Sequence, residues 1–284
     1  MIASTPRKHH YVPEMLVRNF ATASGRVYYL DKNKPDARIE ERNPSSILAK
    51  PHLYSTIDKA GRKDASQELA YSRLESDAAP ILQKVIIAAR TRELPSLTKS
   101  EKECVDAFLF EQWRRVPELR ESLMTAKDLD GMLDGAVDAL RERLGREPSY
   151  EVAASLSDPS FRERVLRNAK VGALNARNPS AMAVLDGRGL AVALAPSGKS
   201  FVLGSRPVVK LCPPDTNDLR DHRVELWLPI SHDVAITPGG ARGTEHTSEL
   251  SGESIRRLNR VVWRSSTKLV SSSLALLTSL ANQR

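Results

Sequence analysis

The residues best suited to chemistry begin with His9, His10 and Tyr11, which stand side by side near the N-terminus and are followed by Pro13. Proline disfavours the helical region for the residue before it, so the chain from His9 to Val12 is predicted to be extended. Successive side chains of an extended segment face opposite ways. His9 and Tyr11 are therefore expected to share one face, and only one of the two histidines can point into any given site.

Glu68 and Glu75 are the acidic members of a second group of candidate residues. They lie on one stripe of a helix that is predicted to begin near Ser66, together with Tyr71 and Ala78. Because that stripe also carries apolar side chains, it is expected to face the interior. The burial of a carboxylate is costly unless its charge is paired, so Glu75 is expected to have a partner.

Gln112 and Arg115 belong to the next predicted helix. The segment Thr98–Glu101 has the sequence of a capping box and opens this helix, and Pro117 limits its end. Gln112 falls on the apolar stripe of the helix, and Arg115 borders it. An amide and a guanidinium at the edge of an apolar face can bind an anion or neutralise a buried carboxylate.

Two interpretations of these residues stay open. The catalytic one assigns one polar pocket to His9, His10, Glu68, Glu75, Gln112 and Arg115. Such a pocket would supply general acid and base groups, an anion clamp and metal ligands, which suits the hydrolysis of a phosphodiester. The structural one pairs a buried Glu75 with Arg115, while Gln112 and a histidine complete the hydrogen bonds.

A divalent metal ion is the cofactor that the catalytic interpretation would use. Glu68 and Glu75 are seven residues apart, which corresponds to a rise of about 10.5 Å along a helix. Zinc–oxygen bonds are only about 2 Å long, so the two carboxylates could share one ion only by stretching toward each other. A hydrated magnesium ion on one carboxylate, or two separate ions, fits the spacing better.

Nucleic acid is a candidate partner because the chain is basic, with a formal net charge of +8 and a pI near 9.6. The charge is dispersed, since no run of five or six like charges occurs. The three tryptophans do not form a stacking series for single strands. Pro238–Gly243 is rich in glycine but lacks the Lys-Ser/Thr ending of a phosphate-binding loop, so it is predicted to be a surface loop. The alternative to a nucleic-acid partner is a mildly basic surface that carries charges of both signs.

The composition is that of a globular protein, with 40% hydrophobic and 27% charged residues. The sequence has no apolar stretch of the roughly 20 residues that a membrane span needs, and residues 1–6 lack the apolar core of a secretory signal. Cys104 and Cys212 have no spacing typical of a disulfide framework or a metal site. A cytoplasmic location is therefore expected.

Strands and helices are predicted in separate runs, which indicates an α+β fold in one domain, with a central helical bundle, small N-terminal strands and a C-terminal antiparallel sheet. The expected regions are a small β region (1–65), a helical region (66–180), a β-rich region (181–250) and a C-terminal helix (251–284). The expected strands include 52–56, a hairpin of 181–185 and 190–194, and 233–237, which is closed by 238–240. The expected helices include 117–144, one from Tyr150 or Ser160 to 175, and 251–280, with a kink or a new helix after Pro80.

The segment His9-His10-Tyr11-Val12-Pro13, with Leu16 and Phe20, resembles the opening motif of the bacterial domain-of-unknown-function family 4238. The similarity continues along nearly the whole chain, through the helix Glu68–Glu75, through Gln112, Arg115 and Pro117, through Gly204–Pro207 and Pro229–Ser231, and to Asn259. The resemblance implies that these segments contribute to one site. Substrate contacts are accordingly expected from Tyr11, Ser205, Arg206 and Asn259.

One position departs from the family pattern, because Arg206 stands where the family tends to show an aspartate before Pro207. If that acid takes part in the family's chemistry, this chain has altered or lost it. The leading expectation is a nuclease-like hydrolase of nucleic acid or another phosphodiester, a role that would suit phage defence. The alternative is a non-catalytic binding or sensor protein in which the same polar residues are structural.

Overall fold

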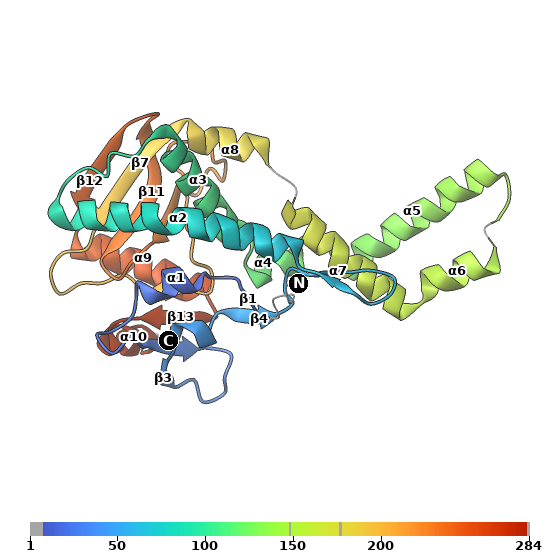
Figure 1. Ribbon diagram of the computed structural model, residues 1–284, viewed down its shortest axis with the longest axis horizontal. Helices are drawn as coiled ribbons and strands as arrows, with labels where there is room; N and C mark the ends of the chain where they lie inside the picture. The colour runs from blue at the N-terminus through green and yellow to red at the C-terminus, as the bar shows by residue number, and fades with distance from the viewer. Residues whose placement is uncertain (1–7, 148, 176–177, 283–284) are drawn as a thin grey trace, which may run out of the picture. The chain divides into compact units, whose positions relative to one another are not determined.

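The computed structural model of the protein describes residues 8–147, 149–175 and 178–282 (Figure 1). Two compact units make up the chain. Unit 1 comprises Met1–His9, Pro51–Ala70 and Pro117–Arg177, and unit 2 comprises His10–Lys50, Tyr71–Val116 and Asn178–Arg284. Helices occur together with several antiparallel sheets, which confirms the predicted α+β class. The organisation as one domain stays a prediction.

Unit 2 contains a five-stranded and a four-stranded sheet. The strand order of the larger sheet is β12 (Glu245–Glu249), β7 (Arg188–Leu194), β11 (Val234–Ala241), β10 (Glu225–Pro229) and β9 (Val209–Leu211). Its β12–β7 pair is parallel and its other pairs are antiparallel, so the expected antiparallel sheet has one parallel pair. The smaller sheet has the antiparallel order β3 (Ile39–Arg42), β2 (Val27–Asp31), β13 (Lys268–Ser271) and β8 (Leu203–Gly204). β7 is buried at five consecutive positions, as is typical of a strand that is covered on both faces.

The helices of unit 2 are α1 (Glu14–Arg18), most of α2 (Ser66–Thr91), α3 (Lys99–Arg114), α8 (Pro179–Asp186), α9 (Gly252–Ser265) and α10 (Leu274–Ala281), with a 3-10 turn at Pro44–Ser46. α8 contacts β7 of the larger sheet, and α10 contacts β13, β2 and β3 of the smaller one. α9 contacts β8 and β9, one strand from each sheet. Its buried Ile255, Leu258 and Val262 are spaced by three and four residues, so one face of the helix packs on both sheets.

Unit 1 is mostly helical. Its elements are the hairpin β5 (Thr56–Ile57) and β6 (Lys63–Asp64) and the helices α4 (Pro117–Ser122), α5 (Ala126–Leu144), α6 (Tyr150–Ser157) and α7 (Pro159–Asn175). The side-chain amide of Asn168 on α7 bonds both the N–H and the carbonyl oxygen of Ile57 at 2.8 Å. This pair of hydrogen bonds attaches the hairpin to α7. A further two-stranded sheet pairs β1 (Lys8–His10) with β4 (Ala49–Pro51).

The two long helices that carry the candidate residues form largely as predicted. α2 (Ser66–Thr91) continues through Pro80, so the expected second helix after this proline is wrong. α3 begins with the expected capping box, in which Thr98 and Glu101 each accept a hydrogen bond from the main chain of the other. Among the described residues, no helix combines the length and the apolar composition needed to cross a membrane.

The expected hairpin 181–194 is wrong in its first half, because residues 179–186 form α8 instead of a strand. The side chain of Asn178 accepts a hydrogen bond from the N–H of Ala181 at 3.0 Å, and Pro179 occupies the first helical position. An asparagine cap followed by proline is a strong helix start, and alanine, methionine and leucine favour helix. These local signals outweigh the apolar run that suggested a strand.

The expected C-terminal helix 251–280 is also wrong, because β13 separates α9 from α10. β13 pairs with β2 on one side and β8 on the other and is fully buried at its last three positions. Its pairing partners come from residues 27–31 and 203–204. Helical periodicity in the sequence carries no information about such distant partners, so the tertiary structure decides this segment.

Four further expectations are corrected or decided by the structure. Residues 52–54 form a turn instead of a strand, because His52 adopts the left-handed region with φ 50°. The expected helix 117–144 divides into α4 and α5 at a second capping box, formed by Thr125 and Asp128. Both alternative starts of the next helix are used, since α6 and α7 are separate. β11 continues through Pro238–Gly240 to Ala241, so the glycine-rich segment is a strand end and a tight turn and not a surface loop.

Candidate functional site

His9 lies on β1 in unit 1, and its imidazole is fully buried. Its Nδ1 atom accepts a hydrogen bond from the main-chain N–H of Tyr54 at 3.1 Å. The Tyr54 ring stacks on the imidazole with ring centroids 5.9 Å apart, and the His52 ring meets it edge-on at 6.0 Å. The turn at residues 52–54 therefore surrounds His9 with two aromatic rings.

Glu68, in the first turn of α2, lies close to His9 in unit 1. Its Oε2 atom lies 3.7 Å from Nδ1 of His9, which is beyond the range of a hydrogen bond. Because Nδ1 accepts a bond from Tyr54, this nitrogen carries no proton, and the neutral imidazole is protonated on Nε2. Proton transfer between Nδ1 and Glu68 would first require the bond from Tyr54 to break.

The two histidines have different surroundings, as their alternation in an extended strand predicts. His10 is half-buried and donates from Nε2 to the carbonyl oxygen of Ser45 at 3.3 Å. The strand ends at His10, so the prediction that it stays extended to Val12 is wrong. A bend at Tyr11 and Val12 allows both of these side chains to be buried, and the N–H of Tyr11 bonds to the carbonyl of Leu48 at 3.0 Å.

Arg115, at the end of α3, is among the largest fully buried side chains of the described chain, with 1% exposed. In unit 2 its Nη2 atom donates to Oε1 of Glu75 at 2.5 Å, and Nε donates to the main-chain carbonyl of Tyr11 at 3.3 Å. The guanidinium lies over the Tyr71 ring, 4.9 Å from its centroid. The buried positive charge therefore has a carboxylate, a carbonyl and an aromatic face as partners.

Gln112 completes what we call the Arg115 cluster, defined as Glu75, Gln112 and Arg115. With its amide oxygen turned toward the guanidinium, Gln112 accepts from Nη2 at 3.0 Å and from Nε at 3.2 Å. Gln112 is fully buried, whereas the Glu75 side chain is 22% exposed. Within the cluster, Glu75 is therefore the side chain that is most exposed to solvent. Beside the cluster, burial raises the pKa of Glu111, while the positive charges of Arg114 and Arg115 oppose that rise.

The other sequence-derived candidates hold main-chain segments of unit 2 in place. The side chain of Asn259 on α9 accepts from the N–H of Val202 at 3.0 Å and donates to the carbonyl of Ser200 at 2.8 Å. Ser205 Oγ accepts from the N–H of Thr267 at 3.0 Å. The N–H of Arg206 donates to Ser266 Oγ at 3.2 Å. These contacts attach residues 200–206 to α9 and to the start of β13, and the expected substrate contacts stay a prediction.

Ser231, in the turn between β10 and β11, supports a charged contact on unit 2. Its hydroxyl donates to Oδ1 of Asp233 at 2.6 Å, and Arg90 on α2 binds the same carboxylate through two nitrogens at 2.8 Å. Burial alone would raise the pKa of Asp233, but the hydrogen bonds from Arg90 and Ser231 outweigh burial and lower this pKa to about 2. The carboxylate is therefore ionised at neutral pH and bound to α2.

This low pKa predicts a specific pH dependence for the variant Asp233→Asn. Because the folded-state pKa of about 2 lies below the ordinary value of 3.8, the stabilisation is present above pH 4 and is lost as pH falls through 2. The variant should lose roughly 1–2 kcal/mol of unfolding free energy at pH 7, a figure reduced for the solvent screening of the partly exposed Arg90. Urea unfolding should show the gap to wild type narrowing below pH 4. A constant gap, or an equal loss in the exposed control Asp36→Asn, would contradict this assignment.

The described part of the chain contains no group of ligands for a metal ion shared by Glu68 and Glu75. Among residues 8–147, 149–175 and 178–282, no three histidine, cysteine, aspartate or glutamate side chains are grouped to hold one ion. Glu75 is bound to Arg115, and Glu68 lies beside His9. The divalent cofactor considered from the sequence is therefore not assigned to these two glutamates.

Comparison with known proteins agrees with the motifs along the chain. The family model described as Protein of unknown function (DUF4238) matches residues 8–274. The chain belongs to this family. No curated protein and no solved structure matches it. The match covers most of this DUF4238 chain, and the description of the family names no reaction.

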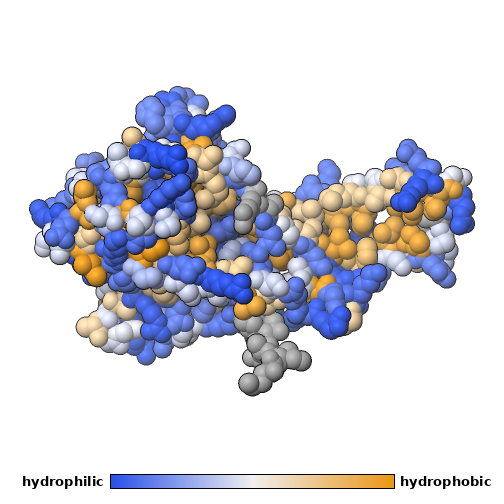
Figure 2. Space-filling model, turned by 45° about the horizontal axis from the view of Figure 1, so that its top comes forward, coloured by the Kyte–Doolittle hydropathy of each residue, from blue (hydrophilic) through white to orange (hydrophobic). Residues whose placement is uncertain are grey.

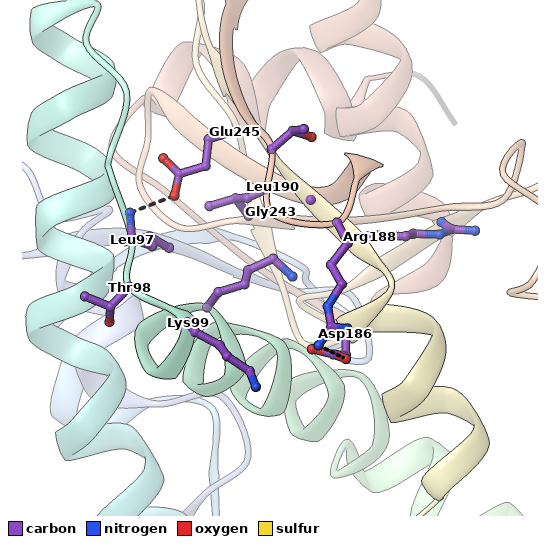
Figure 3. A pocket seen from close by; sticks show the side chains of 12 residues that line it. Leu97, Thr98, Lys99, Asp186, Arg188, Leu190, Gly243 and Glu245 are labelled. Carbon is purple, nitrogen blue, oxygen red and sulfur yellow. Dashed lines mark hydrogen bonds and ion pairs between the residues drawn. The ribbon is translucent and has the colours of Figure 1, made fainter.

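A pocket of about 490 Å³ lies in unit 2 of this DUF4238 chain (Figure 3). Its walls come from the start of α3, the start of β7 and the turn between β11 and β12, through residues 97–99, 102, 186, 188–190 and 242–245. Ligand pockets commonly have volumes of roughly 300–1,000 Å³. The sequence did not suggest this pocket, because its three segments are separated by more than 50 residues; the nearest signal was the glycine-rich segment that ends at Gly243.

Charged residues of both signs line the pocket and differ in how firmly they are held. Figure 3 shows the Glu245 carboxylate reaching the Leu97 main chain, where its oxygens accept from the N–H groups of Leu97 and Ser96, both at 2.7 Å. Lys102 binds the buried carboxylate of Asp106 at 2.6 Å. Arg188 donates to the main-chain carbonyls of Leu219, Asp221 and Val224. These three side chains have fixed positions.

Lys99 and Arg242 are held more loosely. Arg242 is 61% exposed and binds Asp186 at 2.8 Å, while Lys99 is 78% exposed and lies 3.7 Å from Glu103. Ion pairs in solvent contribute only about 0–1 kcal/mol. An anion that enters the pocket could therefore replace Asp186 or Glu103 as the partner of these cations at little cost.

Proposed function

We propose that the protein is a non-catalytic binding protein in which the Arg115 cluster is structural. The burial of Arg115, whose guanidinium is bound by Glu75, Gln112 and the Tyr11 carbonyl, is the observation that carries this proposal. A guanidinium with 1% exposure and three protein partners is poorly placed to clamp a substrate anion. Such a network favours a role in fixing α2 against α3 within unit 2.

The ligand site of this proposal is the unit 2 pocket, and its ligand class is a small molecule that bears a phosphate. Arg242 offers a planar guanidinium, which matches phosphate oxygens in pairs, and Lys99 adds a second cation with a weak present partner. The walls at Leu97 and Leu190 give an apolar surface for the remainder of such a ligand.

Calorimetric titration with inorganic phosphate and with adenosine 5′-monophosphate tests this binding. We expect saturable binding that weakens about tenfold or more in Arg242→Ala, since a hydrogen bond to a charged group contributes about 1.5–3 kcal/mol. Asp186→Asn should tighten binding, because it removes the carboxylate that competes for Arg242. The matched control is Arg220→Ala, an exposed arginine paired with Asp218 and absent from the pocket lining. A lack of saturable binding, or an equal loss in the control, would reject the pocket as the site.

A second candidate function is a nuclease-like hydrolase, and one observation favours it. Glu75 retains 22% exposure beside the Arg115 guanidinium, so a general acid or base and a positive charge are adjacent. The net charge of +8 would favour a nucleic-acid substrate. A cytoplasmic setting, with a role in phage defence, belongs to this candidate as a proposal only.

Purified protein incubated with DNA or RNA and Mg²⁺, Mn²⁺ or Zn²⁺ separates the two candidates. Cleavage by the wild type that disappears in Glu75→Gln but persists in the control Glu93→Gln would support the hydrolase. A complete absence of cleavage, or equal cleavage by all three proteins, would leave the binding function as the better account.

A further inference from the structure

The part of unit 1 that α5 and α6 form exposes several large apolar side chains. The exposed large apolar side chains in and beside it are Leu123, Met132, Leu144, Tyr150 and Val152. Tyr150 is 86% and Met132 is 59% exposed. Figure 2 shows apolar surface gathered over the part of the molecule that α5 and α6 form. Contiguous apolar surface of this kind commonly marks a site of protein association.

The apolar residues of α5 form one stripe along the helix. They are Leu129, Leu133, Val137, Leu140 and Leu144, at spacings of three or four residues. Leu129 is buried, the middle three are half-buried, and Leu144 is 47% exposed. α5 also contacts α7. The stripe is thus covered at the start of the helix and becomes progressively uncovered toward its end.

Charges on α5 are divided between its two halves. The first half, residues 126–138, carries four aspartates against one lysine, and residues 139–147 carry three arginines against two glutamates. Asp130, Asp134 and Arg141 flank the apolar stripe on the same side, as helical geometry requires for these positions. In an antiparallel pair of such helices, the acidic half of one would lie opposite the basic half of the other.

We propose that a second copy of this chain covers the stripe, with the two α5 helices packed antiparallel about a two-fold axis near Val137. In this register Leu133 lies opposite Leu140 of the second copy and Asp134 lies opposite Arg141, while Leu144 lies at the margin of the surface that is already covered around Leu129. Arg141 is bound to Asp138 and Glu147, but these pairs are exposed and can be shared with a further carboxylate. A two-fold interface is self-complementary, which this palindromic order of apolar and charged positions satisfies.

The size of the surface sets the expected strength. A helix of 19 residues is about 28 Å long, and α6 adds Tyr150 and Val152 beside it. Stable protein interfaces bury about 1,000 Å² or more in total, and smaller ones are weak or transient. Because the start of the stripe is already covered within the chain, we expect a weak dimer that dissociates on dilution.

Sedimentation velocity of the full chain across a concentration series tests this dimer. We expect the mass to rise from 31.4 kDa toward twice that value, and Leu144→Asp to weaken dimerisation at least tenfold. Ala139→Asp is the matched control, because it adds the same charge to the same helix away from the stripe. Both variants should keep the wild-type helical circular dichroism, since both positions are exposed.

Charge reversal tests the antiparallel register. Asp134→Arg and Arg141→Asp should each weaken the dimer, and the double variant should restore it, because the opposite charges are then exchanged between the same positions. A protein that stays monomeric at 100 µM would overturn the proposal. Slow hydrogen exchange of the stripe in such a monomer would mean that the stripe is covered within one chain, which overturns the proposal equally. A dimer that is insensitive to Leu144→Asp, or equally sensitive to Ala139→Asp, would overturn it as well.

Discussion

Replacement of Arg115 by methionine should lower the free energy of unfolding by about 3–5 kcal/mol, the usual cost of removing one partner of a buried ion pair. Methionine fills a similar volume but leaves the carboxylate of Glu75 and the amide of Gln112 without their cation. The loss should appear in urea unfolding followed by circular dichroism.

Arg220→Met is the matched control for this prediction. Arg220 also pairs with a carboxylate, that of Asp218 at 2.5 Å, but its side chain is 80% exposed. Exposed ion pairs contribute little, so the control should unfold close to the wild type. Equal stability of the two variants would mean that the buried cluster does not hold unit 2 together.

Substitution of Gly204 by alanine should have the next largest effect, roughly 3 kcal/mol, at the upper end of the usual cost of overpacking. A Cβ atom built on this β8 glycine would collide with Oγ of Ser266 and would lie 2.8 Å from Cγ1 of Val262. Because Ser266 Oγ also accepts from the N–H of Arg206, its displacement would break that hydrogen bond. A shift in the urea midpoint measures this loss.

Gly172→Ala provides the contrast to Gly204→Ala. Gly172 lies within α7, and nothing lies within 4 Å of a Cβ atom built there. Alanine in an open helical position should stabilise the protein by up to about 1 kcal/mol. A similar destabilisation by both substitutions would show that the close approach of β8 and α9 is not what requires glycine.

Local signals in the sequence predicted much of the framework around the Arg115 cluster. The capping box at Thr98 and the apolar stripe that includes Phe108 depend only on neighbouring residues, and both occur in α3 as expected. The pairing of a carboxylate on one stripe with a guanidinium beside another could also be foreseen, because a buried charge needs a partner. The sequence therefore indicated the Glu75–Arg115 ion pair, while its structural role stays a prediction.

Other features could not be read in this way because they depend on residues far away in the chain. β13 looked helical by its apolar spacing, but pairing with β2 and β8 on both sides makes it a central strand. The pocket lined by Lys99 and Arg242 exists only because the fold of unit 2 brings three separate segments together. The turn at His52, with φ 50°, placed aromatic rings around His9 where a strand was expected.

A double-mutant cycle on Glu75 and Arg115 tests whether the Arg115 cluster is structural. Unfolding free energies of the wild type, Glu75→Leu, Arg115→Met and the double variant give the coupling between the two side chains. We predict a coupling of about 2 kcal/mol or more, with the double variant more stable than Arg115→Met, because apolar residues tolerate the buried position better than a lone charge. A coupling below about 0.5 kcal/mol, within the error of independent sites, would contradict the claim that this pair holds the fold.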